Sequence, residues 1–514
     1  MSTRNPFDRQ EMRFEVEPDA GPAREVASGP VFRLLLLGDF SGADSATRTP
    51  LAGRRAVEVD RDNFDEVLTK IAPHVMLRIG DEPPFPLKVS DIDDFRPEAI
   101  FEKNPLFLEM RRLRARLEDP DRWRAAAEDL GQELSPAPQT ASPSEPTGPV
   151  TARSLIGGGS LLDQMMEREA PTPTAPQTKP SKDPVLEIAR RAVQPYLVAS
   201  TTQEQTDLLE KMDDAISARM REVLHHPGVR AVEAAWRSLF LLIRTLDTGP
   251  DLKVYIFDIT RDELQQDLFS SDDLTESNIC RLMVEAPRNY SADSRWAAIA
   301  ASYRFGADAD DLRALNRLMK LAKAANAPFL GNATPALAGV PSFEGVLDPK
   351  HWTDPNETAG GFFALLRRQP EAPWMGLSAP RFLLRMPYGA KSDRCDAFPF
   401  EEIPGEPEPD DYLWGPSSYL LAMLLGQAFS DFGWEFKPGT VAEVKGLPLH
   451  MYRSAAGPMS ASCAEAWFTE PSVEALAERG FIVVVPYKDQ DRVRIFQMNS
   501  IAEQYSLIRG SWNG

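Results

Sequence analysis

A proline-rich stretch divides this 514-residue sequence into two unequal parts. Nine of the 48 residues from Ser135 to Lys182 are proline, and most of the others are small or polar. A segment of this composition buries too little apolar surface to offset the entropy that it would lose on ordering. We therefore predict a linker over residues 133–182, between a first region (residues 1–132) and a second region (residues 183–514).

Both regions are predicted to mix helices with strands. The apolar run of residues 31–40 is typical of a strand, whereas residues 60–72 repeat apolar side chains at helical spacing, with Asp62 as the expected N-cap. In the second region, Thr260 begins a helix with a capping-box sequence. Residues 481–498 form two β-rich runs around a polar turn, which predicts a hairpin. The alternation of such elements indicates an α/β or α+β fold with mixed sheets.

Charge and hydropathy exclude several classes of protein. The net charge of −20 lacks the basic surplus that sequence-independent nucleic-acid binding requires. The longest apolar run, residues 419–429, is too short to span a bilayer and is interpreted as a buried core helix, so no membrane insertion is expected. The N-terminal residues lack the apolar core of a signal peptide. Three widely spaced cysteines favour free thiols in the cytoplasm, where we expect this protein.

The strand of residues 31–40 runs into a Gly-Asp-Phe-Ser-Gly turn at residues 38–42. Such a turn is compatible with a phosphate cradle, with a nucleophilic serine or with a simple change of chain direction. Ser41 lies one position too late for the Gly-x-Ser-x-Gly nucleophile turn. The turn also lacks the lysine of a P-loop and the spacing of a dinucleotide-binding motif. No cofactor site is therefore predicted.

The five histidines do not form a recognisable metal or catalytic site. His225 and His226 are adjacent, so on a helix their side chains point about 100° apart and do not form an i, i+4 metal pair. Their position near the end of a helix favours a role in helix capping. The other three histidines have no cysteine or carboxylate at ligand spacing. We therefore predict no catalytic residue, no metal site and a protein that is not an enzyme.

One short amphipathic segment interrupts the linker at residues 160–169. Ser160 and Asp163 form a capping-box pattern, which indicates a helix start. The apolar stripe of this predicted helix consists of Leu161, Leu162, Met165 and Met166. A helix of this length is marginal on its own, so the stripe either folds back onto its own domain or docks into the groove of a partner. The residues alone leave both alternatives open.

Residues 32–117 resemble the small sheath subunit (TssB or VipA) of bacterial type VI secretion systems. The resemblance rests on the strand ending in GDFSG, on AVEVDRDNFDEVLTKIAPHV and on DIDDFRPEAIFEKNPLFLEMRRLRARL. Residues 154–500 resemble the large sheath subunit (TssC or VipB) of the same machine. The matching segments include HHPGVRAVEAAWRSLFLLI, AKAANAPFLGNATPALAG and YLWGPSSYLLAMLLGQAFSDFGW.

The resemblance implies two sheath subunits fused in one chain, with the two regions intertwined and the GDFSG turn serving a structural role. It further implies a contractile sheath protein without a cofactor, which associates with itself or with other sheath subunits. The implied partners are an inner tube protein similar to Hcp, baseplate components and an ATPase similar to ClpV that recognises helix 160–169. The family's large subunit normally continues past the segment matching RIFQMNSIAEQYS, whereas this chain stops at Gly514. The alternative expectation is therefore a non-polymerising adaptor, or a cap or baseplate-associated protein.

Overall fold

The structure is a computed structural model that describes residues 29–42, 48–80, 83–130, 205–289, 294–353 and 361–513. The chain divides into two units, one formed by residues 1–105 with 216–514 and the other by residues 106–215. The predicted linker and both of its predicted boundaries lie outside the described residues, so the predicted domain limits stay predictions.

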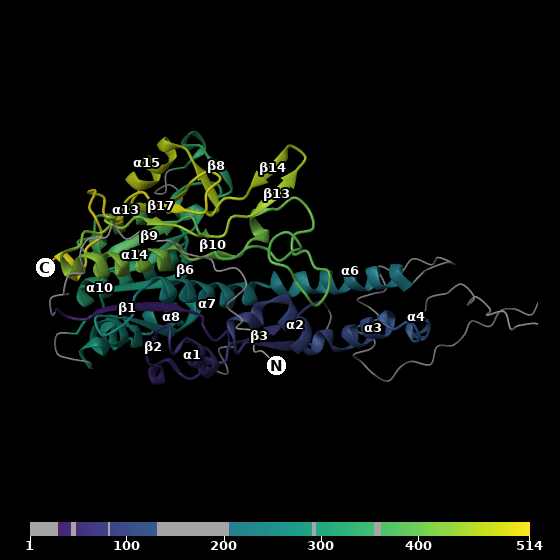
Figure 1. Cartoon of the computed structure of the whole chain (residues 1–514). Helices are drawn as coiled ribbons and strands as arrows, with labels where there is room; N and C mark the ends of the chain where they lie inside the picture. Colours follow the sequence, from purple (N-terminus) through teal and green to yellow (C-terminus); the bar gives the residue numbers. More distant parts are fainter. Residues whose placement is uncertain are drawn as a thin grey trace, which may run out of the picture. The chain divides into compact units, whose positions relative to one another are not determined.

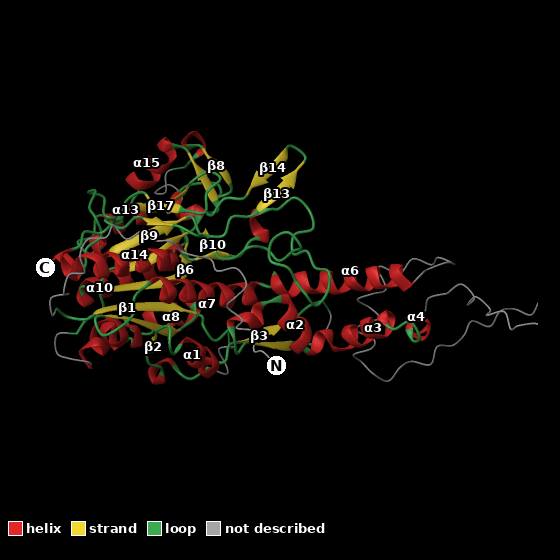
Figure 2. Ribbon diagram, viewed as in Figure 1, coloured by secondary structure: helices red, strands yellow, loops and turns green. Residues whose placement is uncertain are grey.

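A nine-stranded sheet with the order β12-β17-β16-β9-β7-β6-β1-β5-β2 organises the larger unit (Figures 1 and 2). Its strands are β1 (Phe32–Gly38), β2 (Val57–Val59), β5 (Leu252–Asp258), β6 (Ala298–Phe305), β7 (Phe329–Ala333), β9 (Met375–Ala379), β12 (Glu443–Val444), β16 (Phe481–Pro486) and β17 (Val493–Ile495). The six strands from β5 to β16 are parallel, while β2 and β17 run antiparallel to their inner neighbours. The predicted α/β class with a mixed sheet and the predicted hairpin of β16 and β17 are confirmed.

Strand β1, from the first region, lies between two strands of the second region, as its purple colour among teal elements shows (Figure 1). It pairs with β5 from Phe32 to Gly38, and all seven of its residues are buried. Alternate side chains point to opposite faces of a strand, so Phe32 stacks on Phe429 at 4.6 Å while Leu35 and Leu37 enter the core on the other face. The predicted intertwining of the two regions is therefore confirmed.

Helices cover both faces of this sheet (Figure 2). One face carries α7 (Pro227–Thr245) and α14 (Ser417–Phe432), and the other carries α8 (Arg261–Leu268) and α10 (Ala309–Ala325). Helix α14 is buried along most of its length, which confirms the core helix predicted over residues 419–429. None of the helices in the described ranges combines the length and the apolar character needed to cross a membrane.

The remaining elements are shorter or lie outside the main sheet. The helices are α1 (Phe64–Ile71), α2 (Pro97–Lys103), α3 (Leu108–Glu118), α4 (Trp123–Asp129), α6 (Gln205–Leu224), α9 (Asn278–Cys280), α11 (Pro335–Ala338), α13 (Phe362–Arg367) and α15 (Glu470–Glu478). The strands are β3 (His74–Leu77), β4 (Phe85–Lys88), β8 (Gly345–Leu347), β10 (Phe382–Leu383), β11 (Trp414–Gly415), β13 (Met451–Ser454), β14 (Gly457–Ser460) and β15 (Ala466–Phe468).

The smaller unit consists of α3, α4 and the first half of α6. Arg114 on α3 forms an ion pair with Asp213 on α6, with 2.6 Å between Nε and Oδ1. The side-chain amide of Gln205 donates a hydrogen bond of 2.6 Å to the carbonyl of Leu117. Here too a helix of the first region packs on a helix of the second.

Helix α1 confirms the helical prediction for residues 60–72, but the predicted N-cap is wrong. The N-cap is Asn63, and its side chain makes no capping hydrogen bond to the helix. Instead, the Asp60 carboxylate accepts hydrogen bonds of 2.9 Å from the amides of Asp62 and Asn63, and the Asn63 side chain accepts one of 3.0 Å from the amide of Asp60. The side chains of this turn thus accept hydrogen bonds from the backbone amides of the turn itself, before the helix starts.

A β-bulge in β6 is filled by Asn332 of β7. The register of the pairing between β6 and β7 shifts between Ala300 and Arg304. The buried amide of Asn332 donates hydrogen bonds of 3.0 Å to the carbonyls of Ala301 and Tyr303, and its oxygen accepts one of 2.9 Å from the amide of Ser418 at the start of α14. Buried backbone groups need hydrogen-bond partners. Asn332 supplies them for the carbonyls of the bulge and also connects the start of α14 to β7.

Candidate functional site

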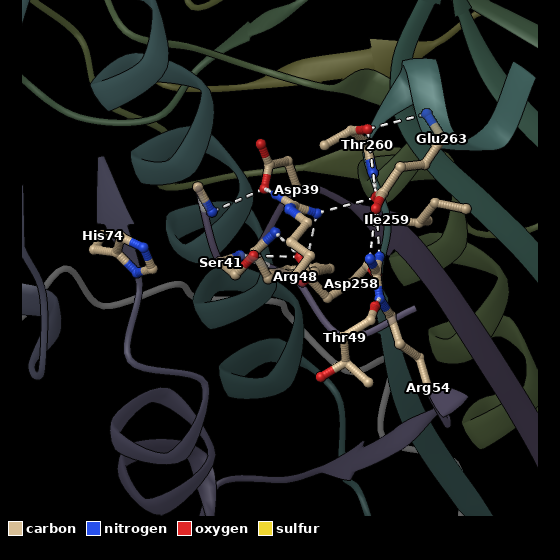
Figure 3. Close-up of polar contacts among 12 residues, drawn as sticks. Asp39, Ser41, Arg48, Thr49, Arg54, His74, Asp258, Ile259, Thr260 and Glu263 are labelled. Carbon is tan, nitrogen blue, oxygen red and sulfur yellow. Dashed lines mark hydrogen bonds and ion pairs between the residues drawn. The ribbon is translucent and has the colours of Figure 1, made fainter. Parts of the chain in front are cut away.

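The GDFSG turn lies where β1 and β5 end side by side at the carboxyl edge of the sheet (Figure 3). The carboxylate of Asp258 accepts hydrogen bonds from the amides of Phe40 at 2.8 Å and Ser41 at 3.0 Å. Asp39 accepts a hydrogen bond of 2.8 Å from the amide of Gly42. Gly42 has φ of +59°, and a Cβ there would lie 2.8 Å from a methyl group of Val232, so this position requires glycine.

Both neighbouring elements also hold this turn. The indole of Trp236 on α7 donates a hydrogen bond of 2.7 Å to the carbonyl of Phe40, and the amide of His74 on β3 donates one of 2.8 Å to the carbonyl of Ser41. The hydroxyl of Ser41 is buried and has no hydrogen-bond partner in the described part of the chain. The geometry is that of a structural turn, as the resemblance implied.

Two arginines connect the turn to the start of α8 (Figure 3). Arg54 donates hydrogen bonds of 2.9 Å to the carbonyl of Asp258 and to Glu263, and Arg48 pairs with Asp39 and Glu263. Glu263 also closes the predicted capping box with Thr260, which is confirmed. Burial opposes the charge on Glu263, but the hydrogen bonds from Arg54 and from the Thr260 amide lower its pKa to about 2.

A second ionic cluster, the Arg385 cluster (Glu233, Arg385 and Glu402), is buried in the larger unit. Arg385 bonds Glu402 through two nitrogens at 2.7 and 2.9 Å and Glu233 through Nε at 2.9 Å. The amide of Tyr388 donates a further hydrogen bond of 2.9 Å to Glu402. Burial alone would raise the pKa of Glu402, but the charge of Arg385 and the hydrogen bonds from Arg385 and the Tyr388 amide lower it to about 2.

The loop between β10 and β11, which carries Arg385 and Glu402, also contacts the first region. Arg96, which precedes α2, forms two hydrogen bonds of 2.8 and 2.9 Å with Asp393, and its guanidinium lies 5.5 Å from the ring centre of Tyr388. Phe101 of α2 contacts Phe398 at 4.8 Å between ring centres. The cluster therefore supports an interface between the two regions, and the role of its ion pairs is structural.

The predicted capping role of the two histidines needs a correction. The Nδ1 atom of His226 accepts a hydrogen bond of 3.2 Å from the amide of Gly228, so His226 caps the start of α7 instead of the end of α6. Pro227 starts the new helix, which makes His226 its N-cap. Burial lowers the pKa of His226, in keeping with its role as an acceptor.

The remaining sequence-based expectations concern metal ligands, the cysteines and the linker. Within the described ranges, no group of three or more His, Cys, Asp or Glu side chains is arranged to hold a metal ion. The three cysteines are buried and free of disulfides, as predicted. The predicted partner-binding residues of the linker, Leu161, Leu162, Met165 and Met166, lie outside the described residues.

Sequence reasoning missed the Arg385 cluster because its members are far apart in the chain. The one local signal is Glu233, a carboxylate on an otherwise apolar face of α7, where its side chain is fully buried. A charge at such a position requires a buried partner. Arg237, four residues later on the same helix, supplies one at 2.7 Å, whereas the sequence does not say that Arg385 supplies the other.

The carboxylates with lowered pKa values predict acid sensitivity. The ordinary pKa of Glu402 is 4.5 and its folded value is about 2, so its stabilising effect is complete above about pH 4.5 and is lost as the pH falls through about 2. A shift of this size corresponds to about 3 kcal/mol of unfolding free energy. Urea unfolding measured between pH 6 and pH 3 should show this loss beginning, and Glu402→Gln should weaken the pH dependence. Glu406→Gln, an exposed change in the same loop, is the matched control, and equal pH dependence in both variants would contradict the assignment.

Comparison with known proteins gives a consistent result. The family described as VipB, EvpB/VC_A0108, tail sheath N-terminal domain, matches residues 206–502, which is more than half of the chain. The family described as type VI secretion system, VipA, VC_A0107 or Hcp2, matches residues 3–137. A curated relative, the type VI secretion system sheath protein TssC1 of Pseudomonas aeruginosa strain PAO1, is 29% identical over 332 residues. That alignment covers 60% of this chain and 66% of the relative, so the chain spans slightly less than two thirds of it.

Proposed function

Because this chain belongs to the VipB tail sheath family, we propose that it is a structural subunit of a type VI secretion system, which assembles as a contractile sheath around an inner tube. The observation that carries the proposal is the position of β1. This strand comes from the part that matches VipA, and it completes the sheet built by the part that matches VipB. One chain thus supplies both components in a fixed ratio, as an assembly of alternating subunits requires.

The proposed partners follow from membership of the family. Association with further copies or with other sheath subunits is supported by the family itself. We extend the proposal to an inner tube protein similar to Hcp, to baseplate components and to an ATPase similar to ClpV, with assembly in the cytoplasm. The protein acts in this proposal through interfaces and without catalysis, a role that suits the Arg385 cluster and the structural GDFSG turn.

Co-expression with the cognate tube protein tests the sheath function. We expect electron microscopy to show tubular polymers with a regular surface lattice. Discrete particles without tubes would contradict the sheath proposal and support a non-polymerising adaptor, cap or baseplate protein of the same machine. A chain in which β1 is disrupted by Leu35→Asp is the control, because it should form neither tubes nor discrete folded particles.

Helix 160–169 is proposed to bind the ATPase through its apolar stripe, which the sequence places on one face. The double variant Leu162→Asp, Met166→Asp should keep the melting temperature of the wild type but lose binding to the N-terminal domain of the ATPase. The double variant Gln164→Asp, Thr172→Asp adds the same charge outside the stripe and should bind normally. Unchanged binding by the first variant, or a large fall in its thermal stability, would assign the stripe to an intramolecular contact.

A further inference from the structure

A cavity of about 620 Å³ lies at the carboxyl edge of the sheet, beside the GDFSG turn. Asp39 after β1, Thr260 after β5, Arg304 near the end of β6 and Asn332 of β7 all line it. Parallel strands of open α/β sheets commonly place their ligand sites at this edge, because the chain there leaves the sheet in loops. The volume is also within the usual range of sites for small ligands.

The wall of this cavity carries one more arginine than carboxylates, although the whole chain has a net charge of −20. Its arginines are Arg230, Arg261, Arg304 and Arg381, and its carboxylates are Asp39, Asp262 and Asp410. Asp39 is already engaged by Arg48 and by the amide of Gly42. Helices α7, α8 and α14 start at or beside the wall, and the N-terminus of a helix carries a positive partial charge.

Three of the four arginines have partners in the described structure. Arg261 pairs with Asp311 and Arg381 pairs with Glu465, whereas Arg230 donates to backbone carbonyls, including that of Asp411 at 3.0 Å.

Arg304 differs from these three. It is partly buried and makes no hydrogen bond or ion pair with any described residue, and its Nε atom is shielded from solvent. Burial and the neighbouring charge of Arg381 lower the pKa of Arg304, and this effect outweighs the opposing influence of the Glu465 and Asp410 carboxylates. An unpaired, partly buried guanidinium is costly to the folded state.

We propose that this cavity is a binding site for an oxyanion, a carboxylate or a phosphate, with Arg304 as its principal ligand. The planar guanidinium of arginine matches two oxygens of such a group. The Nε atom of Arg381 also lacks a partner among the described residues and provides a second donor beside Arg304. The oxyanion that binds Arg304 can be a free anion from solution or an acidic side chain of a second copy of the chain. Only the second source rests on the proposed function.

Thermal unfolding of the full chain at constant ionic strength tests the site with inorganic phosphate as the probe. At about 10 mM, phosphate is too dilute for general salt effects, and a site of millimolar affinity should raise the melting temperature of the wild type by about 3 °C. Arg304→Met should remove this response. Without phosphate, the same variant should melt about 2 °C higher than the wild type, because it removes an unpaired charge from a partly buried position.

Arg394→Met is the matched control, because the side chain of Arg394 is 77% exposed and is not among the residues that line the cavity. It should retain the full response to phosphate. An equal response in Arg304→Met, or no response in the wild type, would overturn the proposal. A lower melting temperature for Arg304→Met without phosphate would also overturn it, since Arg304 would then be an internal structural residue.

Sedimentation velocity separates the two sources of the anion. If a second copy supplies the carboxylate, both phosphate and Arg304→Met should weaken self-association. If the ligand is a free anion, self-association should be the same in all conditions while the stabilisation by phosphate persists. A chain that forms no sheath but is stabilised by phosphate through Arg304 would contradict the proposed function and still support the site.

Discussion

Arg385→Met is expected to destabilise the larger unit by about 3–5 kcal/mol, because it leaves Glu402 buried without its arginine counter-charge and leaves Glu233 dependent on Arg237. The side chain of Glu233 is fully buried and that of Glu402 is 2% exposed, so water does not replace the arginine. The loss should appear as a lower midpoint of urea unfolding, followed by circular dichroism. It should also loosen the loop that holds α2 through Arg96 and Asp393.

A second variant distinguishes loss of charge balance from loss of packing. Arg385→Met combined with Glu402→Gln removes the buried carboxylate that lost its arginine partner. It should recover at least about 1 kcal/mol of the unfolding free energy lost in Arg385→Met. Arg394→Met, an exposed change on the same loop, should alter stability by less than about 0.5 kcal/mol. An Arg385→Met protein as stable as the wild type would show that the cluster contributes nothing to folding.

Cleavage between the two regions is expected to leave a complex that does not separate. A protease site placed within residues 135–182 would produce two fragments, and these should co-elute in size-exclusion chromatography in the absence of denaturant. The reason is the sheet, since β1 forms backbone pairs with both β5 and β6 and all seven of its residues are buried. Separation should occur only together with the loss of secondary structure, as the sheet would lose a central strand.

The control for this experiment weakens the shared sheet without altering the cleavage site. Leu36→Asp in β1 places a carboxylate in the core and should make the cleaved fragments separate or precipitate. Fragments of the wild type that elute apart in mild buffer would contradict the intertwined arrangement.

Much of the fold could be predicted from local patterns. The apolar run of residues 31–40 indicated a strand, and the final β-rich runs around a polar turn indicated a hairpin. The position of β1 between β5 and β6 could not be predicted from local patterns. Nothing in the residues of β1 selects these partners, and the expectation of intertwined regions came from the resemblance to two sheath subunits.

Local propensity also failed at specific positions. Asp62 is a good N-cap by residue type, yet Asp60 and Asn63 form a turn of their own that displaces it. His226 was expected at a helix end, but Pro227 starts a new helix directly after it. The surroundings of Arg304 and the carboxylate partners of Arg385 depend on the path of the whole chain, so the charged cavity and the buried ionic cluster have no signature within any short window of sequence.

The central position of β1 has a consequence for how the chain is made. β1 leaves the ribosome long before its neighbour β5, since Phe40 and its partner Asp258 are separated by 218 positions. At ordinary rates of translation the strand waits about 10–40 s for that neighbour to be synthesised. During this interval four consecutive leucines have no sheet to join, and such a segment is prone to aggregate. We therefore expect the newborn first region to need protection from aggregation until the second region has been synthesised.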